Sequence, residues 1–236
     1  MLIKYLLATI VAGLFAGILV TPAMYLRTVP LILHAETFED AEGGHDHGAG
    51  EAAHSHESAE PHEHETGPEL PFGRLGNTIL ANLVAGAGFA LALGGVALLL
   101  GRRITARNGI YWGLAGFFVF AFAPSLGLAP ELPAMPAADL GSRQVWWVAT
   151  VLLSAIGLYL IALRREAWAR PLGLAVIVAP HLYGAPKAED LSSPVPAVLA
   201  SEYAVASLAT NLFMWAVLGL ALGWMLQRYA SAELEG

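Results

Sequence analysis

A long stretch without charge opens the chain and restricts what it can fold into. Residues 5–26 carry no charged side chain and are bounded by Lys4 and Arg27. A helix needs about 20 apolar residues to cross a hydrocarbon core of roughly 30 Å. Further apolar runs follow at about residues 78–100, 110–128, 145–163, 171–185 and 198–226. The pattern predicts an all-α polytopic membrane protein, a helical bundle of about six transmembrane helices.

The fifth apolar run leaves the number of spans open, because it is short and is interrupted by Pro180 and His181. Five spans are the alternative if this run is re-entrant. For the first run the alternative is a cleaved secretory signal, although the apolar part of such signals usually covers only about 7–15 residues. Glycine spacings typical of close helix packing occur at Gly13 and Gly17, Gly109 and Gly113, and Gly219 and Gly223, and the isolated G-x-G at Gly86–Gly88 is also expected to pack.

The composition excludes several function classes. Hydrophobic residues make up 56% of the chain and charged residues 13%, against about 25% charged residues in soluble proteins. The Lys and Arg residues number 12 and form no long basic stripe, so no nucleic-acid partner is expected. Cysteine is absent, which removes thiolate metal sites and cysteine nucleophiles. Neither H-E-x-x-H nor a Walker A sequence occurs, so we expect no enzyme and no ATP hydrolysis by the chain itself.

The charges of the loops predict the orientation in the membrane. The loops after the second and fourth apolar runs carry six arginines, against the single acid Glu166. The positive-inside rule places both loops in the cytoplasm and, with six spans, both termini as well. The first long loop is then extracytoplasmic, on a multi-pass protein of the bacterial inner membrane. We divide the chain into a first transmembrane helix (1–27), an extracytoplasmic juxtamembrane segment and flexible loop (28–77), a bundle of four or five transmembrane helices (78–228) and a short tail (229–236).

The first long loop, from His34 to Glu69, has the composition of a metal-binding segment. It contains three His-x-His pairs. The remaining residues are mainly Glu, Asp, Gly, Ala, Ser and Pro, which cannot build a core, so we expect the loop to be disordered. Imidazoles at i and i+2 fall on the same side of an extended chain and can bind one metal ion, with nearby carboxylates as further ligands. A polar linker without metal is the alternative. The predicted ligands are His45 and His47, His54 and His56, and His62 and His64.

Ionisable residues near the spans give further candidate ligands. His181 follows Pro180, Glu202 lies near the start of the last run, and Asn211 lies near its middle. Such residues are costly in lipid and often mark ion pathways, so we predict an uptake site with His181 and Glu202 outermost and Asn211 further in. The alternative is that His181 caps an interfacial turn and Glu202 reaches to the surface. Glu36 and Glu39, spaced i and i+3, could share a helix face between the first span and the histidine loop, or simply be solvated.

Several motifs together resemble the CbtA family of proposed bacterial cobalt transporter subunits. They are AGLFAG in the first run, the AE-x-x-E pattern of Glu36 and Glu39, the histidine-rich loop, PSLGLAPELP with Asp139 and RQVWW after it, and PHLYGAP followed by PVPAVLA. The resemblance implies cobalt uptake serving cobalamin synthesis, with Co²⁺ as the transported ion. It also implies a small one-span partner with a histidine-rich tail. Members of the family are usually described with five spans.

The residues and the resemblance together predict transport of a divalent transition-metal cation, with the histidine-rich loop as the cation collector. Co²⁺ uptake is the first expectation. A nickel or zinc transporter is an alternative, because imidazole and carboxylate ligands do not select sharply among these ions. A non-transporting membrane subunit that senses metal or delivers it to a partner is the alternative of a different class.

Overall fold

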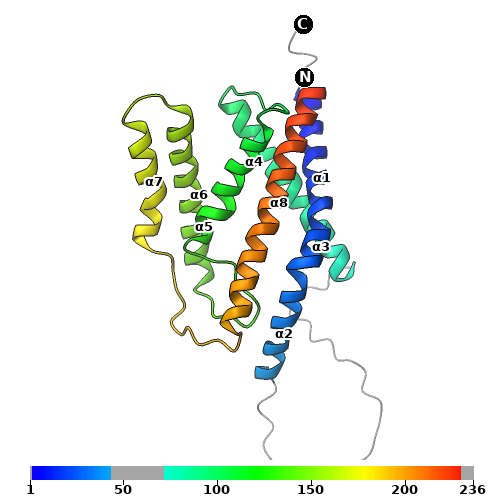
Figure 1. Ribbon diagram of the computed structural model, residues 1–236, viewed down its shortest axis with the longest axis vertical. Coiled ribbons are helices and arrows are strands. Elements are labelled where there is room, and N and C mark those ends of the chain that lie inside the picture. Colours follow the sequence, from blue (N-terminus) through cyan, green and yellow to red (C-terminus); the bar gives the residue numbers. More distant parts are fainter. Residues whose placement is uncertain (1, 44–71, 230–236) are drawn as a thin grey trace, which may run out of the picture.

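The computed structural model describes residues 2–43 and 72–229 and, within them, contains helices and no strand (Figure 1). The all-α fold class predicted from the sequence is confirmed. The elements are α1 (Leu2–Arg27), α2 (Val29–Gly43), α3 (Gly73–Leu99), α4 (Gly109–Phe117), the π-helix η1 (Phe118–Phe122), α5 (Ala123–Ser125), α6 (Leu140–Leu163), α7 (Ala169–Tyr183) and α8 (Ala197–Tyr229).

The described chain runs back and forth between two ends of one bundle. Four helices, α1, α3, α6 and α8, are long and apolar enough to cross a membrane, and Gly109–Ser125 is apolar but shorter. With α7, these segments make six passes, so both ends of the described chain lie at the same end of the bundle (Figure 1). The interruption predicted in the fifth run does not occur, because Pro180 lies in the last turn of α7 and the helix continues to Tyr183.

Small residues let α1 lie close against α3. A Cβ atom on Gly13 would overlap the backbone of Gly86, and one on Gly17 would overlap the carbonyl of Asn82. Membrane helices commonly associate through such small residues, because lipid is as apolar as a leucine side chain and only close packing favours contact. The Asn82 Nδ2 adds a hydrogen bond of 3.0 Å to the Thr21 Oγ1. These contacts confirm that the Gly13 and Gly17 pair serves helix packing.

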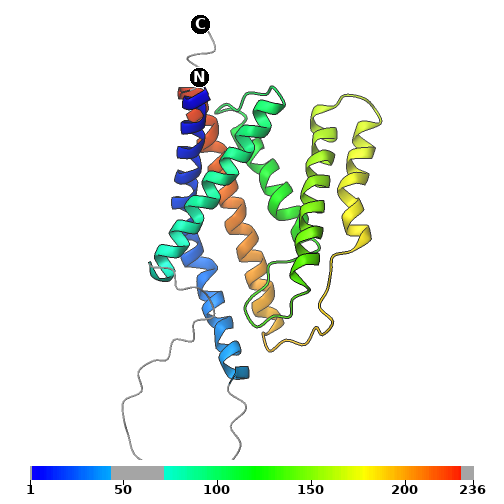
Figure 2. The same cartoon turned by 180° about the vertical axis from the view of Figure 1, so that it is seen from behind.

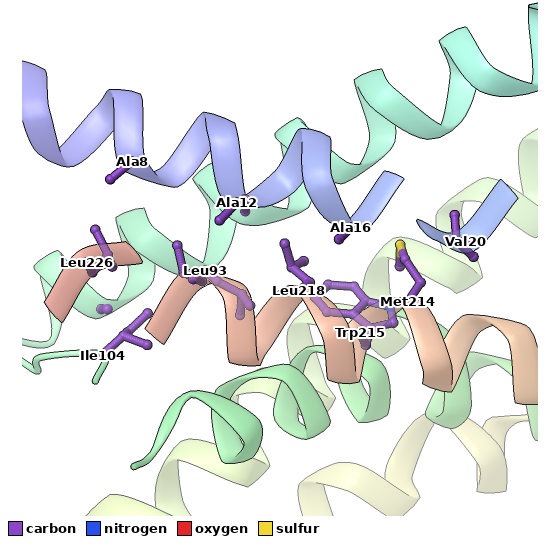
Figure 3. Packing of buried hydrophobic residues seen from close by; sticks show 13 residues of the cluster. Ala8, Ala12, Ala16, Val20, Leu93, Ile104, Met214, Trp215, Leu218 and Leu226 are labelled. Atoms are coloured by element: carbon purple, nitrogen blue, oxygen red, sulfur yellow. The ribbon is translucent and has the colours of Figure 1, made fainter. Parts of the chain in front are cut away.

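The helix α8 crosses the centre of the bundle and contacts both α1 and α4. Figure 3 shows Ala8, Ala12, Ala16 and Val20 of α1 on the side facing α8, where they meet larger side chains such as Trp215 and Leu218. On its other side α8 packs against α4, and Cβ atoms on Gly109 or Gly113 would overlap carbonyl oxygens of Gly219 or Trp215. The glycine pairs of both helices therefore pack on each other.

The helices α6 and α7 form a second packed pair. The backbones of Gly157 and Gly173 come so close that a Cβ on either would overlap the other's carbonyl oxygen. Figure 2 shows this pair beside α4 and α5, away from α1 and α3. The pair joins the rest of the bundle through contacts of α6 with η1 and α5. The α6–α7 pair therefore meets the rest of the bundle at the π-helix η1 and at the short helix α5.

Asp139 begins α6 as its N-cap. Its Oδ1 accepts a 2.8 Å hydrogen bond from the Ser142 N–H, and Ser142 Oγ donates to the Asp139 carbonyl at 2.9 Å. The backbone and then the side-chain hydrogen bond of Ser142 lower the pKa of Asp139 below its ordinary value of 3.8. N-cap carboxylates stabilise helices by satisfying a free N–H and the helix dipole.

The Asp139 cap makes a testable contribution to stability. We expect Asp139→Ala to lower the Tm of the purified protein by a few degrees at pH 7, while Asp139→Asn, which also caps helices, stays near the wild type. Because the folded-state pKa is lowered, the contribution is fully present above pH 3.8 and is lost as the pH falls through the lowered value. Thermal unfolding in detergent across this range measures it, and a pH-independent difference between wild type and Asp139→Ala would contradict the assignment.

Candidate functional site

A cavity of about 690 Å³ lies where the two parts of the bundle meet. Its wall is formed by η1, α5, the start of α6, one face of α8 and the segment 128–131 that follows α5. Aromatic side chains, Phe120 and Trp147, form part of the wall. Most of the lining is apolar, and its polar residues are Ser125, Glu131, Arg143, Gln144, Ser207 and Asn211.

The cavity exists because the third pass is not a regular helix. In η1 the Ala123 N–H bonds to the Phe118 carbonyl, five residues back, instead of four. Pro124 follows and has no N–H, so one carbonyl of the preceding turn loses its helical donor. Interrupted helices occur within membranes where they line a cavity or pack on protein, and π-helical turns are frequent at functional sites. The break places Phe120, Pro124 and Ser125 along the cavity.

One ion pair lies in the cavity wall. Arg143 Nη2 and Glu131 Oε2 are 2.6 Å apart, and the side chains are 28% and 27% exposed. Arg143 stands one turn into α6, where its N–H bonds to the carbonyl of the N-cap Asp139 at 3.1 Å. The N-cap residue thus fixes the backbone of Arg143. Glu131 belongs to the loop that follows α5, so the pair joins this loop to α6.

The helix α8 contributes oxygen acceptors to the cavity wall. Asn211 Nδ2 donates to the Ser207 carbonyl at 3.3 Å, one turn earlier on the same helix face. With its amide nitrogen used in this way, Asn211 has its Oδ1 left as an acceptor at the cavity, and no donor to it occurs in residues 2–43 and 72–229. Together with Glu131, Gln144 and the two serines, the cavity offers oxygen ligands and no imidazole. Such a set suits hard or hydrated divalent cations.

The helix α2 is tied to the loop that lines the cavity. Glu39 Oε1 accepts a 3.0 Å hydrogen bond from the N–H of Ala134, a residue with φ of 60° three positions after Glu131. The same helix buries Ala35 in a cluster with Leu132 of this loop, with Val195 just before α8, and with Leu199 in the first turn of α8. The end of α2, where the histidine-rich segment begins, is therefore attached directly beside the cavity.

Glu36 and Glu39 have separate partners. Both carboxylate oxygens of Glu36 accept hydrogen bonds from Arg74 Nη2, at 2.8 and 2.9 Å, across to the first turn of α3. Glu39 binds the backbone of Ala134 instead. Each carboxylate fixes α2 to a different neighbour. Their use as metal ligands stays a prediction.

His181 and Glu202 lie on helices that do not pack together. The His181 ring meets Trp146 edge-on, with centroids 5.7 Å apart, and its Nε2 is buried with no partner in the described part of the chain. Trp146 also donates to the Pro180 carbonyl at 3.2 Å. Glu202 is exposed on α8, and both Figure 1 and Figure 2 place α6 between α7 and α8. Of the three residues predicted to form one path, Asn211 is the one that lines the cavity.

The predicted histidine ligands between residues 45 and 64 lie outside the described residues. Within residues 2–43 and 72–229, no group of three or more His, Asp or Glu side chains gathers in a way that could hold a metal ion. The polar lining residues that the sequence did not single out are Ser125, Glu131, Arg143, Gln144 and Ser207. Glu131 belongs to the motif PSLGLAPELP and Arg143 to RQVWW, and Ser207 precedes Asn211 by four residues. These motifs and this helical spacing could have indicated the residues from the sequence.

A family model described as "Probable cobalt transporter subunit (CbtA)" matches residues 2–227. No curated protein and no solved structure matches the chain.

Proposed function

Since the chain belongs to the CbtA family of probable cobalt transporter subunits, we propose that it takes up Co²⁺ across the cytoplasmic membrane of a bacterium. The observation that supports the proposed path is the cavity beside the end of α2, whose mostly apolar wall contains the acceptor groups of Glu131, Ser207 and Asn211. In this proposal the ion passes from the imidazoles of the histidine-rich segment to the oxygen acceptors in the cavity wall. The protein works as a subunit of a multi-pass membrane transporter.

The arginines support placing the cavity on the outer side. Six of them, Arg102, Arg103, Arg107, Arg164, Arg165 and Arg170, lie in or beside the connections α3–α4 and α6–α7. These connections lie at the end of the bundle that also holds the start of α1 and the end of α8 (Figure 1). The positive-inside rule makes that end cytoplasmic. The cavity loop and the end of α2 lie at the other end, which faces the outside.

The histidine-rich segment is the collector in this proposal. His45, His47, His54, His56, His62 and His64 supply imidazole nitrogens, which borderline ions such as Co²⁺, Ni²⁺ and Zn²⁺ prefer over the oxygen ligands that Mg²⁺ and Ca²⁺ prefer. Selection against the abundant hard cations therefore takes place in the segment. Holding the ion there raises its effective concentration at the neighbouring cavity.

The cavity is the conducting site in this proposal. An ion released by the imidazoles keeps part of its water shell and meets the oxygens of Glu131, Asn211 and Ser207. Glu36 and Glu39 lie on α2, which precedes the histidine-rich segment in the chain, and can relay the ion. His181 and Glu202 supply further ligands on the outer half of α7 and α8. The small one-span subunit with a histidine-rich tail is the partner we propose for the complex.

Uptake of radiolabelled Co²⁺ by cells tests the proposal. We compare the intact protein, a deletion of residues 44–66, a full-length variant with the six histidines changed to glutamine, and an empty control, at equal membrane levels. Because the deletion and the glutamine variant lose the local concentration of ions, we expect the half-saturating Co²⁺ concentration to rise by about tenfold or more in both.

The competitors in this assay separate the alternatives. We expect excess Mg²⁺ to inhibit the glutamine variant far more than the intact protein, since the six imidazoles that favour borderline ions are then gone and the cavity offers oxygen ligands. Stronger inhibition by Ni²⁺ or Zn²⁺ than by unlabelled Co²⁺ would assign another metal. If the intact protein with its partner subunit accumulates no more cobalt than the control, inward transport is wrong and the protein binds metal without importing it.

A further inference from the structure

The ion pair in the cavity differs from the Arg74–Glu36 pair, which also lies at the outer end. Arg74 and Glu36 meet at the surface, with half of the arginine side chain exposed. Arg143 and Glu131 instead face the cavity, and there the carboxylate of Glu131 is the one negative charge among the lining residues. The best position for a cation in the cavity, beside that carboxylate, is therefore already taken by a guanidinium.

We propose that Arg143 is an exchangeable internal cation, which a divalent ion displaces from Glu131 as it enters the cavity. The inference rests on the proposed function, because it names the residues through which the imported ion is bound. In this scheme Glu131 is a ligand of the ion, and Arg143 neutralises the carboxylate whenever no ion is present. The displaced positive charge then lies beside the bound ion and speeds its departure.

The contact between the two side chains permits such an exchange. The structure records one close contact, from Nη2 to Oε2, so Glu131 Oε1 is not held by the arginine. Each side chain is more than a quarter exposed, so water reaches the pair. A divalent ion carries twice the charge of a guanidinium and is attracted about twice as strongly at equal distance. The oxygen atoms of Asn211 and Gln144 can replace water molecules that the ion loses.

A purely structural ion pair predicts a different behaviour. If Glu131 and Arg143 only fix the loop to α6, removing either charge breaks the same contact and has the same effect. Exchange instead makes the two charges act in opposite directions. Without Arg143 the carboxylate is free to bind ions, and without Glu131 the arginine repels them.

Transport by full-length single variants in membrane vesicles tests the direction of each effect. We expect Arg143→Gln to lower the half-saturating Co²⁺ concentration by about tenfold and to lower the maximal rate, because the ion is held longer. Glu131→Gln raises the half-saturating concentration by about tenfold or more. Arg143→Lys keeps the positive charge and stays within about twofold of the wild type. The control is Glu166→Gln, which breaks the exposed pair with Arg164 and leaves uptake unchanged.

If the half-saturating Co²⁺ concentration shifts in the same direction in Arg143→Gln and Glu131→Gln, the exchange is wrong. Unchanged uptake in both variants would also overturn it.

A second measurement is independent of transport. The chain has no cysteine, so Ser207→Cys places a single thiol at the cavity. We expect Mn²⁺, which prefers oxygen ligands to a thiolate, to slow the reaction of this thiol with a cationic methanethiosulfonate. The protection should be stronger after Arg143→Gln and absent after Glu131→Gln.

The two measurements separate the two hypotheses. If the wild type shows no uptake but the thiol is protected in this order, the proposed import fails and the exchange stands. If uptake occurs and the metal protects the thiol equally in all three backgrounds, import stands and the exchange is wrong.

Discussion

Replacing Gly86 by valine is expected to remove most of the folded protein, while the same change at Gly88, two residues along α3, leaves it intact. A Cβ on Gly86 would overlap the Gly13 carbonyl oxygen and would lie 3.2 Å from the Gly17 nitrogen. These are backbone atoms, so the overlap is removed only if α1 and α3 move apart. A Cβ on Gly88 meets nothing within 4 Å. We expect a loss of about 3 kcal/mol or more for Gly86→Val, at the upper end of the usual cost of overpacking.

Size-exclusion chromatography in detergent and thermal unfolding measure this difference. Gly88→Val controls for the effect of a β-branched residue in the helix. Because Gly13 lies on the other side of the same contact, Gly13→Val should have a similar effect, and the double variant with Gly86→Val should be much less than additive. Equal losses in Gly86→Val and Gly88→Val would show that insertion or helix propensity, and not the α1–α3 contact, governs the outcome.

The sequence predicted the helices well because the bilayer imposes a length and a polarity on them. The first run, bounded by Lys4 and Arg27, corresponds closely to α1. Glycine spacing also predicted close packing, but it could not identify partners. Only the fold shows that Gly13 meets Gly86 and that Gly109 meets Gly219. Pairing of helices depends on how loops return the chain, and the spacing within one helix contains no such information.

The candidate site was predicted less completely, because its contacts join distant segments. The spacing of Glu36 and Glu39 suggested a shared role, yet their partners lie 38 and 95 residues away in the chain. Glu131 and Arg143 are 12 residues apart and meet only because the loop after α5 folds back along α6. The break at η1 lies inside a continuous apolar run, where Pro124 was the one local indication. Asn211 was found because a polar residue in a membrane span is conspicuous in any fold.

Trp215 connects the stability of the bundle to the cavity. Its side chain is fully buried, and a Cβ on Gly116 would overlap its ring. The ring lies 4.7 Å from that of Phe89 and stacks on that of Phe120 at 5.6 Å and 12°. Phe120 in turn lines the cavity. Figure 3 shows Trp215 beside Leu218 within the core between α8 and its neighbours. The tryptophan therefore supports the cavity wall from behind.

We expect Trp215→Ala to lower the free energy of unfolding by about 3–5 kcal/mol, the usual cost of truncating a buried tryptophan. Co²⁺ uptake should be lost even at permissive temperature, because Phe120 can then move into the vacated volume and away from the cavity. Trp215→Phe keeps a ring against Phe120 and should restore part of both properties. Trp224→Ala, on the same helix but with a side chain that is 51% exposed, is the matched control and should change neither. Thermal unfolding and vesicle uptake measure the two effects. Full uptake by a stably folded Trp215→Ala protein would show that the wall formed by Phe120 is not needed for the passage of the ion.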